Sequence, residues 1–194
     1  MKKLLFIACA MALFTACKEE EETITPDTPL EATIVRDINA TYTNYQYFSF
    51  ATGDTVPFAD SSTTKWDIAF KGTTVIVNGG TSGPGNAGVI MKDTLFTEVL
   101  TAPASGYAQD GATSKAIPTG SNNGWYNYAG PPSHLIAPIA GRVFIVRTAD
   151  GKYAKMEFIS YYKGAPAAPD GLTSTSKYYT IRFVYQSDGS TKLN

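Results

Sequence analysis

The last long segment of the chain, Tyr179–Gln186, alternates between large apolar or aromatic residues and mostly polar ones. Successive side chains of a β-strand point to opposite faces of a sheet, so this period of two predicts a strand rather than a helix. The odd-numbered residues are expected to lie on a core and the even-numbered residues partly in water. The next four residues, Ser187–Ser190, have the composition of a turn.

A β-hairpin is predicted just before this strand. Arg142–Arg147 is an apolar run between two arginines, which is typical of a strand that is buried on both faces. Asp150-Gly151 is a common dipeptide of tight hairpin turns. Tyr153–Ser160 then follows as the partner strand.

Shorter segments of the same kind occur in the first half of the chain. Strands are predicted at residues 45–50, 66–70, 73–77 and 89–91, and loops at residues 78–86, 101–124, 129–141 and 162–176. Helix-forming patterns are weak, and only residues 93–100 are expected to form a turn or two. The sequence therefore predicts an all-β fold of antiparallel sheets, with little helix, in a single domain over residues 31–194.

The N-terminus has the three-part pattern of a secretory signal peptide. Lys2 and Lys3 precede an uncharged apolar run, and small residues then precede Cys17. The apolar run is too short to serve as a permanent membrane anchor. A buried core helix is the alternative, but it fits poorly with two lysines at the very start of the chain. We therefore expect residues 1–16 to be a signal peptide that is removed on export.

Residues 13–17 resemble the lipobox of bacterial lipoproteins, with Phe14 where leucine is usual. In that family the cysteine becomes the first mature residue and carries acyl chains such as palmitate, which implies that Cys17 is lipidated. Glu19–Glu22 resemble the lipoprotein export signal, which implies transport to the cell surface, and they also suit a solvated tether. Residues 17–30 are thus expected to comprise the lipidated cysteine, the acidic export signal and a Thr/Pro linker.

Composition argues against several classes of function. The formal net charge is −1 and there is no run of basic residues, which argues against nucleic acid as a partner. The two cysteines are Cys9 and Cys17, so the folded part has neither a disulfide nor a thiolate metal site. Ser133 beside His134 does not make a catalytic triad, and no carboxylate pair stands out. We therefore do not expect an enzyme.

An ordered set of segments resembles the HmuY family of haem-binding bacterial lipoproteins. The set consists of Tyr45–Phe50, Trp66-Asp67, Asn78-Gly79-Gly80, Gly124-Trp125-Tyr126, Arg142–Arg147, Ala149-Asp150-Gly151, Lys155–Phe158 and Tyr179–Tyr185. The resemblance extends over residues 33–186. It implies an all-β fold, a lipid-anchored location on the outer membrane facing the cell exterior, and haem capture followed by transfer to a TonB-dependent transporter.

The resemblance also implies where the ligands of the haem iron lie. Family members hold the iron with two axial histidines or methionines in loops at one end of the β structure. The position that matches one of these ligands is Gly130, which has no side chain to offer. The region that matches the other, residues 107–123, contains neither histidine nor methionine. His134 is the only histidine, so a site with two histidines is excluded.

Five residues remain as candidates for a ligand site. His134 is a candidate metal ligand because a neutral imidazole is a standard axial ligand of haem iron, and a solvated loop histidine is the alternative. Met91 is a second candidate, since a thioether also ligates haem iron, with core packing as its alternative. Trp125, Tyr126 and Tyr128 are candidates to line a pocket for a planar ligand, or else form ordinary cross-strand packing.

Two functions fit these observations. The first is a surface-exposed outer-membrane lipoprotein that binds haem or a related porphyrin and passes it to a TonB-dependent transporter. The alternative is an HmuY-like binding or adhesion module that does not take haem and that recognises protein, glycan or another apolar ligand. Export and the family resemblance favour the first function, and the missing second axial ligand favours the alternative.

Overall fold

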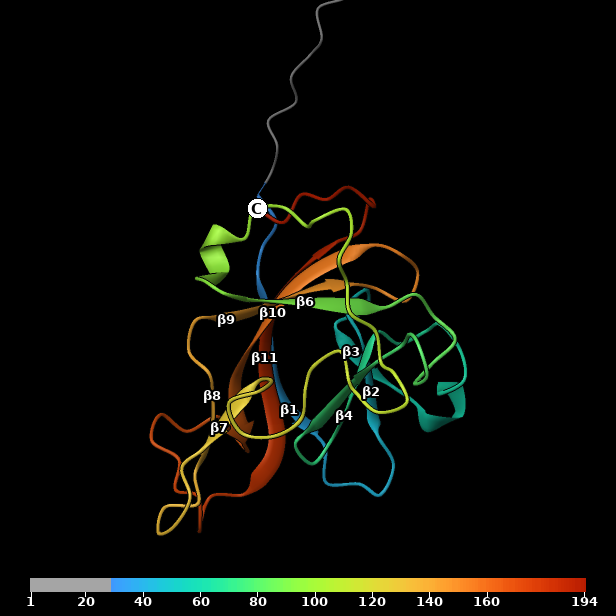
Figure 1. Cartoon of the computed structure of the whole chain (residues 1–194). Helices are drawn as coiled ribbons and strands as arrows, with labels where there is room; N and C mark the ends of the chain where they lie inside the picture. Colours follow the sequence, from blue (N-terminus) through green and yellow to red (C-terminus); the bar gives the residue numbers. More distant parts are fainter. Residues whose placement is uncertain (1–28) are drawn as a thin grey trace, which may run out of the picture.

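Two antiparallel β-sheets enclose the main core of the protein (Figure 1). The computed structural model describes residues 29–194. The predicted signal peptide, the predicted lipidation site Cys17 and the acidic segment after it lie outside the described residues. Within residues 29–194, no helix is both long enough and apolar enough to cross a membrane.

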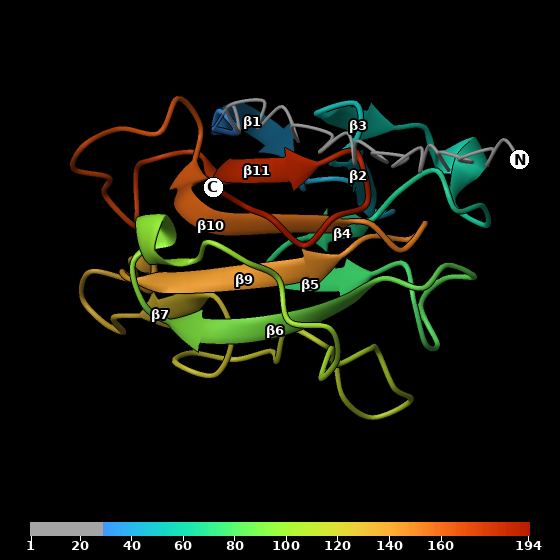
Figure 2. The ribbon, with the colours of Figure 1, turned by 90° about the horizontal axis from the view of Figure 1, so that it is seen from above.

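The strands form three sheets, and Figure 2 shows those of the largest sheet side by side. The five-stranded sheet has the order β1 (Thr33–Asn39), β11 (Ser176–Gln186), β10 (Tyr153–Tyr162), β9 (Arg142–Arg147) and β6 (Gly88–Asp93). The four-stranded sheet has the order β3 (Asp54–Val56), β2 (Gln46–Ser49), β4 (Ile68–Lys71) and β5 (Thr74–Val77). A hairpin of β7 (Tyr126–Tyr128) and β8 (Ile136–Pro138) forms the two-stranded sheet, and η1 (Phe58–Asp60) and η2 (Phe96–Glu98) are short 3-10 helices. The predicted all-β fold is confirmed.

The main core lies between the two larger sheets and follows the alternation in the sequence. The inward face of β11 includes Tyr179 and Phe183, and both are almost fully buried. The ring of Phe183 contacts that of Phe48 in β2 at a centroid distance of 5.9 Å, and Tyr179 contacts Phe70 in β4 at 4.7 Å. Because aromatic side chains bury large apolar areas, these contacts bind one sheet to the other.

The other face of β11 is less exposed than the sequence predicts. Val184 is buried in a second apolar cluster, together with Val143 and Ile145 of β9. Phe96 of η2 and Leu193 near the end of the chain belong to the same cluster. The alternation therefore identified the strand correctly, but it could not reveal that irregular segments cover its polar face.

Both ends of the described chain lie at one end of the larger sheet. The N–H of Leu30 donates a hydrogen bond to the carbonyl of Asn194 at 2.8 Å. β1 then starts beside the carboxyl end of β11, with Thr33 opposite Phe183. In Figure 1 these chain ends lie at the top, and the β7–β8 hairpin lies toward the bottom.

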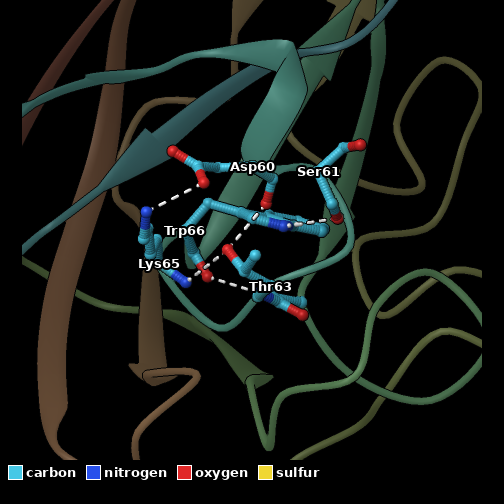
Figure 3. A network of polar contacts seen from close by, with 6 residues as sticks. Asp60, Ser61, Thr63, Lys65 and Trp66 are labelled. Carbon is cyan, nitrogen blue, oxygen red and sulfur yellow. Dashed lines mark hydrogen bonds and ion pairs between the residues drawn. The ribbon is translucent and has the colours of Figure 1, made fainter.

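The loop before β4 is closed by its own polar contacts (Figure 3). The indole Nε1 of the buried Trp66 donates to the carbonyl of Ser61 at 2.9 Å. In the same loop, Lys65 and Asp60 form an ion pair at 2.9 Å. These contacts fix the start of β4 and, with it, the neighbouring Asp67.

Asp67 connects the second sheet to the β9–β10 turn. Its carboxylate accepts hydrogen bonds from the N–H of Phe50 at 2.8 Å and from the N–H of Ala149 at 2.9 Å. Burial of the carboxyl group, together with the nearby charge of Asp150, raises the pKa of Asp67 to about 6, although its hydrogen bonds act in the opposite direction. We assign Asp67 a structural role, because its bonds go to backbone groups of two separate elements.

The bounds of β9 are as predicted, whereas β11 begins three residues earlier and β10 ends two residues later than the sequence predicts. The hairpin of β9 and β10 forms as predicted, and Gly151 occupies its turn with a positive φ of 88°. The predicted loop at residues 129–141 is partly wrong, because Ile136–Pro138 form β8. A strand of three residues that ends in proline has too little pattern to be distinguished from a loop. β1, β3 and β7 were not predicted.

Candidate ligand site at the β7–β8 hairpin

The hairpin loop between β7 and β8 spans residues 129–135. At its base, Tyr128 pairs with Ile136. Gly130 has a positive φ of 70°, which favours glycine, and its carbonyl accepts the N–H of His134 at 2.8 Å. The loop thus folds back on itself and brings the backbone of His134 next to Gly130.

Tyr128 and His134 form a hydrogen-bonded pair on the surface. The hydroxyl oxygen of Tyr128 lies 2.5 Å from Nδ1 of His134, and the ring centroids are 6.0 Å apart. Tyr128 is 40% exposed, and His134 is exposed as well. Since the phenol occupies Nδ1, the other ring nitrogen, Nε2, is the one open to a further ligand.

The end of the preceding loop supports β7. The hydroxyl of Ser121 accepts the N–H of Tyr128 at 2.8 Å, and the N–H of Asn122 donates to the carbonyl of Tyr126 at 2.8 Å. An earlier part of this loop is bonded to the four-stranded sheet instead. The buried carboxylate of Asp110 accepts a hydrogen bond from the N–H of Val77, the last residue of β5, at 3.1 Å. The last residues of the 107–123 region therefore support the hairpin, whereas Asp110 is bonded to β5.

β10 supports the hairpin from the larger sheet. The hydroxyl of Tyr162, at the end of β10, accepts the N–H of Ile136 at 3.0 Å. Tyr162 is buried, so this bond is shielded from competing water. The hairpin is thereby fixed to a rigid strand rather than carried on a free loop.

Trp125 anchors the hairpin in the core. Its side chain is 1% exposed, and its Nε1 donates to the carbonyl of Thr73 at 2.9 Å. The indole stacks on Phe158 at a centroid distance of 4.9 Å and also contacts Tyr161 and Tyr179. These contacts account for Trp125 as a core residue, with no surface left for a ligand.

Most of the chain matches one known protein family. The family model described as HmuY protein matches residues 41–185, which is most of the chain. The chain belongs to the HmuY family. A search of curated proteins found no match.

Solved structures similar to this HmuY-family protein agree in fold at low sequence identity. A predicted lipoprotein of Bacteroides fragilis has 19% identity and a TM-score of 0.54, with 84% of this chain and 95% of that chain covered. A protein of Bacteroides vulgatus, described as a predicted HmuY-like haem-binding protein, has 19% identity and a TM-score of 0.51, with 79% and 91% covered. The apo form of the HmuY analogue of Tannerella forsythia has 18% identity and a TM-score of 0.54, with 82% and 99% covered.

The predicted site residues of this HmuY-family protein fall into separate places. Tyr128, at the base of the hairpin loop, and His134, within the loop, lie side by side. Tyr126 is half-buried against Trp125, at a ring-centroid distance of 4.9 Å. Met91 lies on β6, where it is half-buried and packs against the main core. The structure therefore joins two of the five candidates and leaves the other three in or beside the core.

The sequence predicted the loop between β10 and β11, residues 163–175, but not that this loop lies against the β7–β8 hairpin. Gly171 of this loop lies directly against the backbone of Ser133 and His134. No local pattern could reveal a contact between loops so far apart in the chain. The Asp170-Gly171 dipeptide indicates a turn, but it does not say what the turn touches.

Proposed function

We propose that this protein is a surface-exposed outer-membrane lipoprotein that binds haem or a related porphyrin and passes it to a TonB-dependent transporter. The observation that carries the proposal is the exposed Tyr128–His134 pair in a chain of the HmuY family. One similar structure is described as an HmuY-like haem-binding protein and another as an HmuY analogue, which supports haem as the ligand class.

The pair has the chemistry of an axial ligand with its supporting partner. A histidine that binds a metal through one ring nitrogen usually has a hydrogen-bond partner on the other, which fixes the orientation of the ring. Here the phenol of Tyr128 holds Nδ1, which leaves Nε2 to bind the iron. The donor and the acceptor of this bond depend on which nitrogen of His134 carries the proton.

We propose that His134 provides the iron ligand that position 130, a glycine, cannot provide. The resemblance assigns one axial ligand to position 130, and no heavy atom lies within 4 Å of the point where a Cβ of Gly130 would be. The N–H of His134 is bonded to the carbonyl of Gly130, so the imidazole starts from a backbone position close to the family one. We therefore assign the iron to His134 rather than to Met91, whose side chain packs against the core.

The hairpin offers one imidazole, so the proposed complex has a single protein ligand on the iron. The opposite axial position is then available to water or to a donor of the receiving transporter. We expect a high-spin ferric spectrum rather than the low-spin spectrum of an iron with two strong axial ligands. A single protein ligand on the iron also suits a carrier, because the haem must later be released to the transporter. The proposed role is therefore sequestration and transfer rather than catalysis.

A haemin titration tests the proposal. The three core clusters consist of residues between 30 and 193, so a form comprising residues 18–194, without a histidine tag, keeps every core contact of the described domain. We expect a sharp Soret band to develop, and His134→Ala to weaken binding by about tenfold or more. Ser133→Ala is the matched control, since it keeps the imidazole and removes an adjacent exposed hydroxyl, which accepts a hydrogen bond from the N–H of Leu135 at 3.2 Å. A titration of the unmodified protein in which no sharp Soret band develops would contradict haem as the ligand.

A second function is favoured because, within residues 29–194, there is no histidine besides His134 and both methionines, Met91 and Met156, pack in or against the main core. In this alternative, the hairpin is a binding or adhesion surface for protein, glycan or another apolar ligand. The exposed ring of Tyr128 then provides the contact. It predicts that the protein does not sharpen or shift the Soret band of free haemin, while mutation of Tyr128 still weakens attachment to cells or matrix.

A further inference from the structure

We infer that the β10–β11 loop, residues 163–175, positions His134 and adds an apolar contact for the porphyrin. Gly171 is the positioning residue, and Leu172 is the contact residue. The role of Leu172 rests on the proposed haem function, whereas the role of Gly171 concerns the hairpin itself and holds without a ligand.

Gly171 sets how closely the two loops approach. A Cβ placed on Gly171 would lie 2.3 Å from the carbonyl oxygen of Ser133, and 2.5 Å from both the carbonyl carbon of His134 and the nitrogen of Leu135. Carbon atoms cannot approach other heavy atoms this closely without strong repulsion, and backbone atoms cannot rotate away. Any side chain at position 171 must therefore displace the backbone that carries the imidazole.

The turn that carries Gly171 is held rigidly. The carboxylate of Asp170 accepts the N–H of Leu172 at 2.8 Å and the N–H of Thr173 at 2.9 Å. The N–H of Ser174 donates to the carbonyl of Asp170 at 3.0 Å. A turn with these internal bonds acts as a fixed support, so a displacement of Gly171 is passed on to His134 rather than absorbed.

Leu172 is the apolar group that this turn presents to solvent. Its side chain is 68% exposed, the highest exposure among the large apolar residues of the described domain. It follows Gly171 directly, so its backbone is held next to the hairpin loop. A porphyrin is a broad apolar ring. When it binds beside the hairpin, it covers the exposed side chain of Leu172 and so removes apolar surface from water. Leu172 thus complements Tyr128 as a second apolar contact close to the ligand histidine.

The positioning role has a direct readout that needs no haem. Because His134 is the only histidine, its imidazole gives one unambiguous set of NMR signals. We expect Gly171→Ala to shift these signals in the ligand-free protein. The matched control is Gly111→Ala, where the nearest atom to an added Cβ is the hydroxyl of Ser114 at 3.3 Å. Unchanged His134 signals in Gly171→Ala would overturn the positioning role.

The haemin titration then tests the contact role. We expect Leu172→Ser to weaken haemin binding about fivefold without moving the Soret maximum, since the iron ligand is retained. The matched control is Leu95→Ser, which changes a leucine that is 59% exposed and lies just before η2. Equal affinity of Leu172→Ser and the unmodified protein would overturn the contact role. If the unmodified protein gives no Soret band, the haem function and the Leu172 contact fail together, while the NMR result still decides the role of Gly171.

Discussion

Asp67 accepts a hydrogen bond from the backbone N–H of Ala149, 82 residues later in the chain, at 2.9 Å. The other oxygen of the same carboxylate accepts the N–H of Phe50. A single buried side chain thus fastens the turn of one sheet to the end of a strand in the other. Two predictions on stability come from this arrangement.

Removal of the Asp67 carboxylate is expected to destabilise the fold. Asp67→Ala leaves two buried backbone N–H groups without an acceptor, which costs about 2–5 kcal/mol in the free energy of unfolding. Urea denaturation measures this loss. Asp60→Ala is the control, because its ion pair with Lys65 is partly exposed and such pairs contribute at most about 1 kcal/mol. Similar losses for both variants would contradict the assigned role.

The dependence of stability on pH should reveal the titration of Asp67. Its pKa is raised from 3.8 to about 6, so the folded state takes up a proton at a pH where the unfolded chain has not. The contribution of Asp67 to the free energy of unfolding therefore increases as pH falls from 7 through 6. Asp67→Asn cannot take up this proton. We expect the stability of the unmodified protein relative to Asp67→Asn to rise by about 1 kcal/mol between pH 7 and pH 5.

Denaturation of both proteins at pH 7 and pH 5 in the same salt checks this prediction. The comparison cancels the titration of the other carboxyl groups, which both proteins share. A stability difference that stays constant or shrinks as the pH falls would show that burial does not raise the pKa of Asp67.

Trp125 should matter for stability and not for ligand affinity. Trp125→Phe removes the hydrogen bond to the carbonyl of Thr73 and leaves a small void, which together cost about 1–3 kcal/mol. Because the indole is buried, we expect the haemin affinity of the folded variant to stay within about twofold of the unmodified protein. A large loss of affinity without a loss of stability would place Trp125 at the ligand after all.

Tyr128 should show the opposite behaviour. Tyr128→Phe keeps the exposed ring but removes the hydroxyl that holds Nδ1 of His134, so we expect haemin affinity to fall about tenfold to a hundredfold. Stability should change by less than about 0.5 kcal/mol, since the side chain is on the surface. Tyr42→Phe, at another exposed tyrosine, is the control for both measurements. An unchanged affinity would separate Tyr128 from the site.

The predicted lipid anchor at Cys17 lies outside the described residues and has its own test. If Cys17 carries acyl chains, cells that express the protein should incorporate labelled palmitate into it, and Cys17→Ala should abolish the label. The unmodified protein should partition into the detergent phase of a Triton X-114 extract and the variant into the aqueous phase. Label that persists in Cys17→Ala would contradict the predicted lipidation site.

Sequence patterns predicted the strands with strong burial. Tyr179–Gln186 was predicted from its alternation and Arg142–Arg147 from its continuous apolar run, and both lie in strands whose side chains pack in the core. β1, β3, β7 and β8 were missed because they are short or lie at an edge, where weak burial leaves little pattern.

The candidate site was predictable only in part. His134 stands out as the only histidine, and Tyr128 was among the aromatic candidates. Their contact was not predictable, because it depends on the fold of the hairpin loop. For Trp125 the sequence left two roles open, because tryptophan is common both in protein cores and beside planar ligands. The burial of its side chain in the structure favours the core role.

The pairing of Leu30 with Asn194 has a consequence for access to the site. The chain enters the domain at one pole, and the hairpin with its histidine lies at the other (Figure 1). β11 spans 11 residues between these poles, which corresponds to a length on the order of 30 Å. If the predicted lipid anchor at Cys17 holds the domain, the β7–β8 hairpin lies at the end of the domain farther from Leu30, where the entry of the chain does not obstruct it.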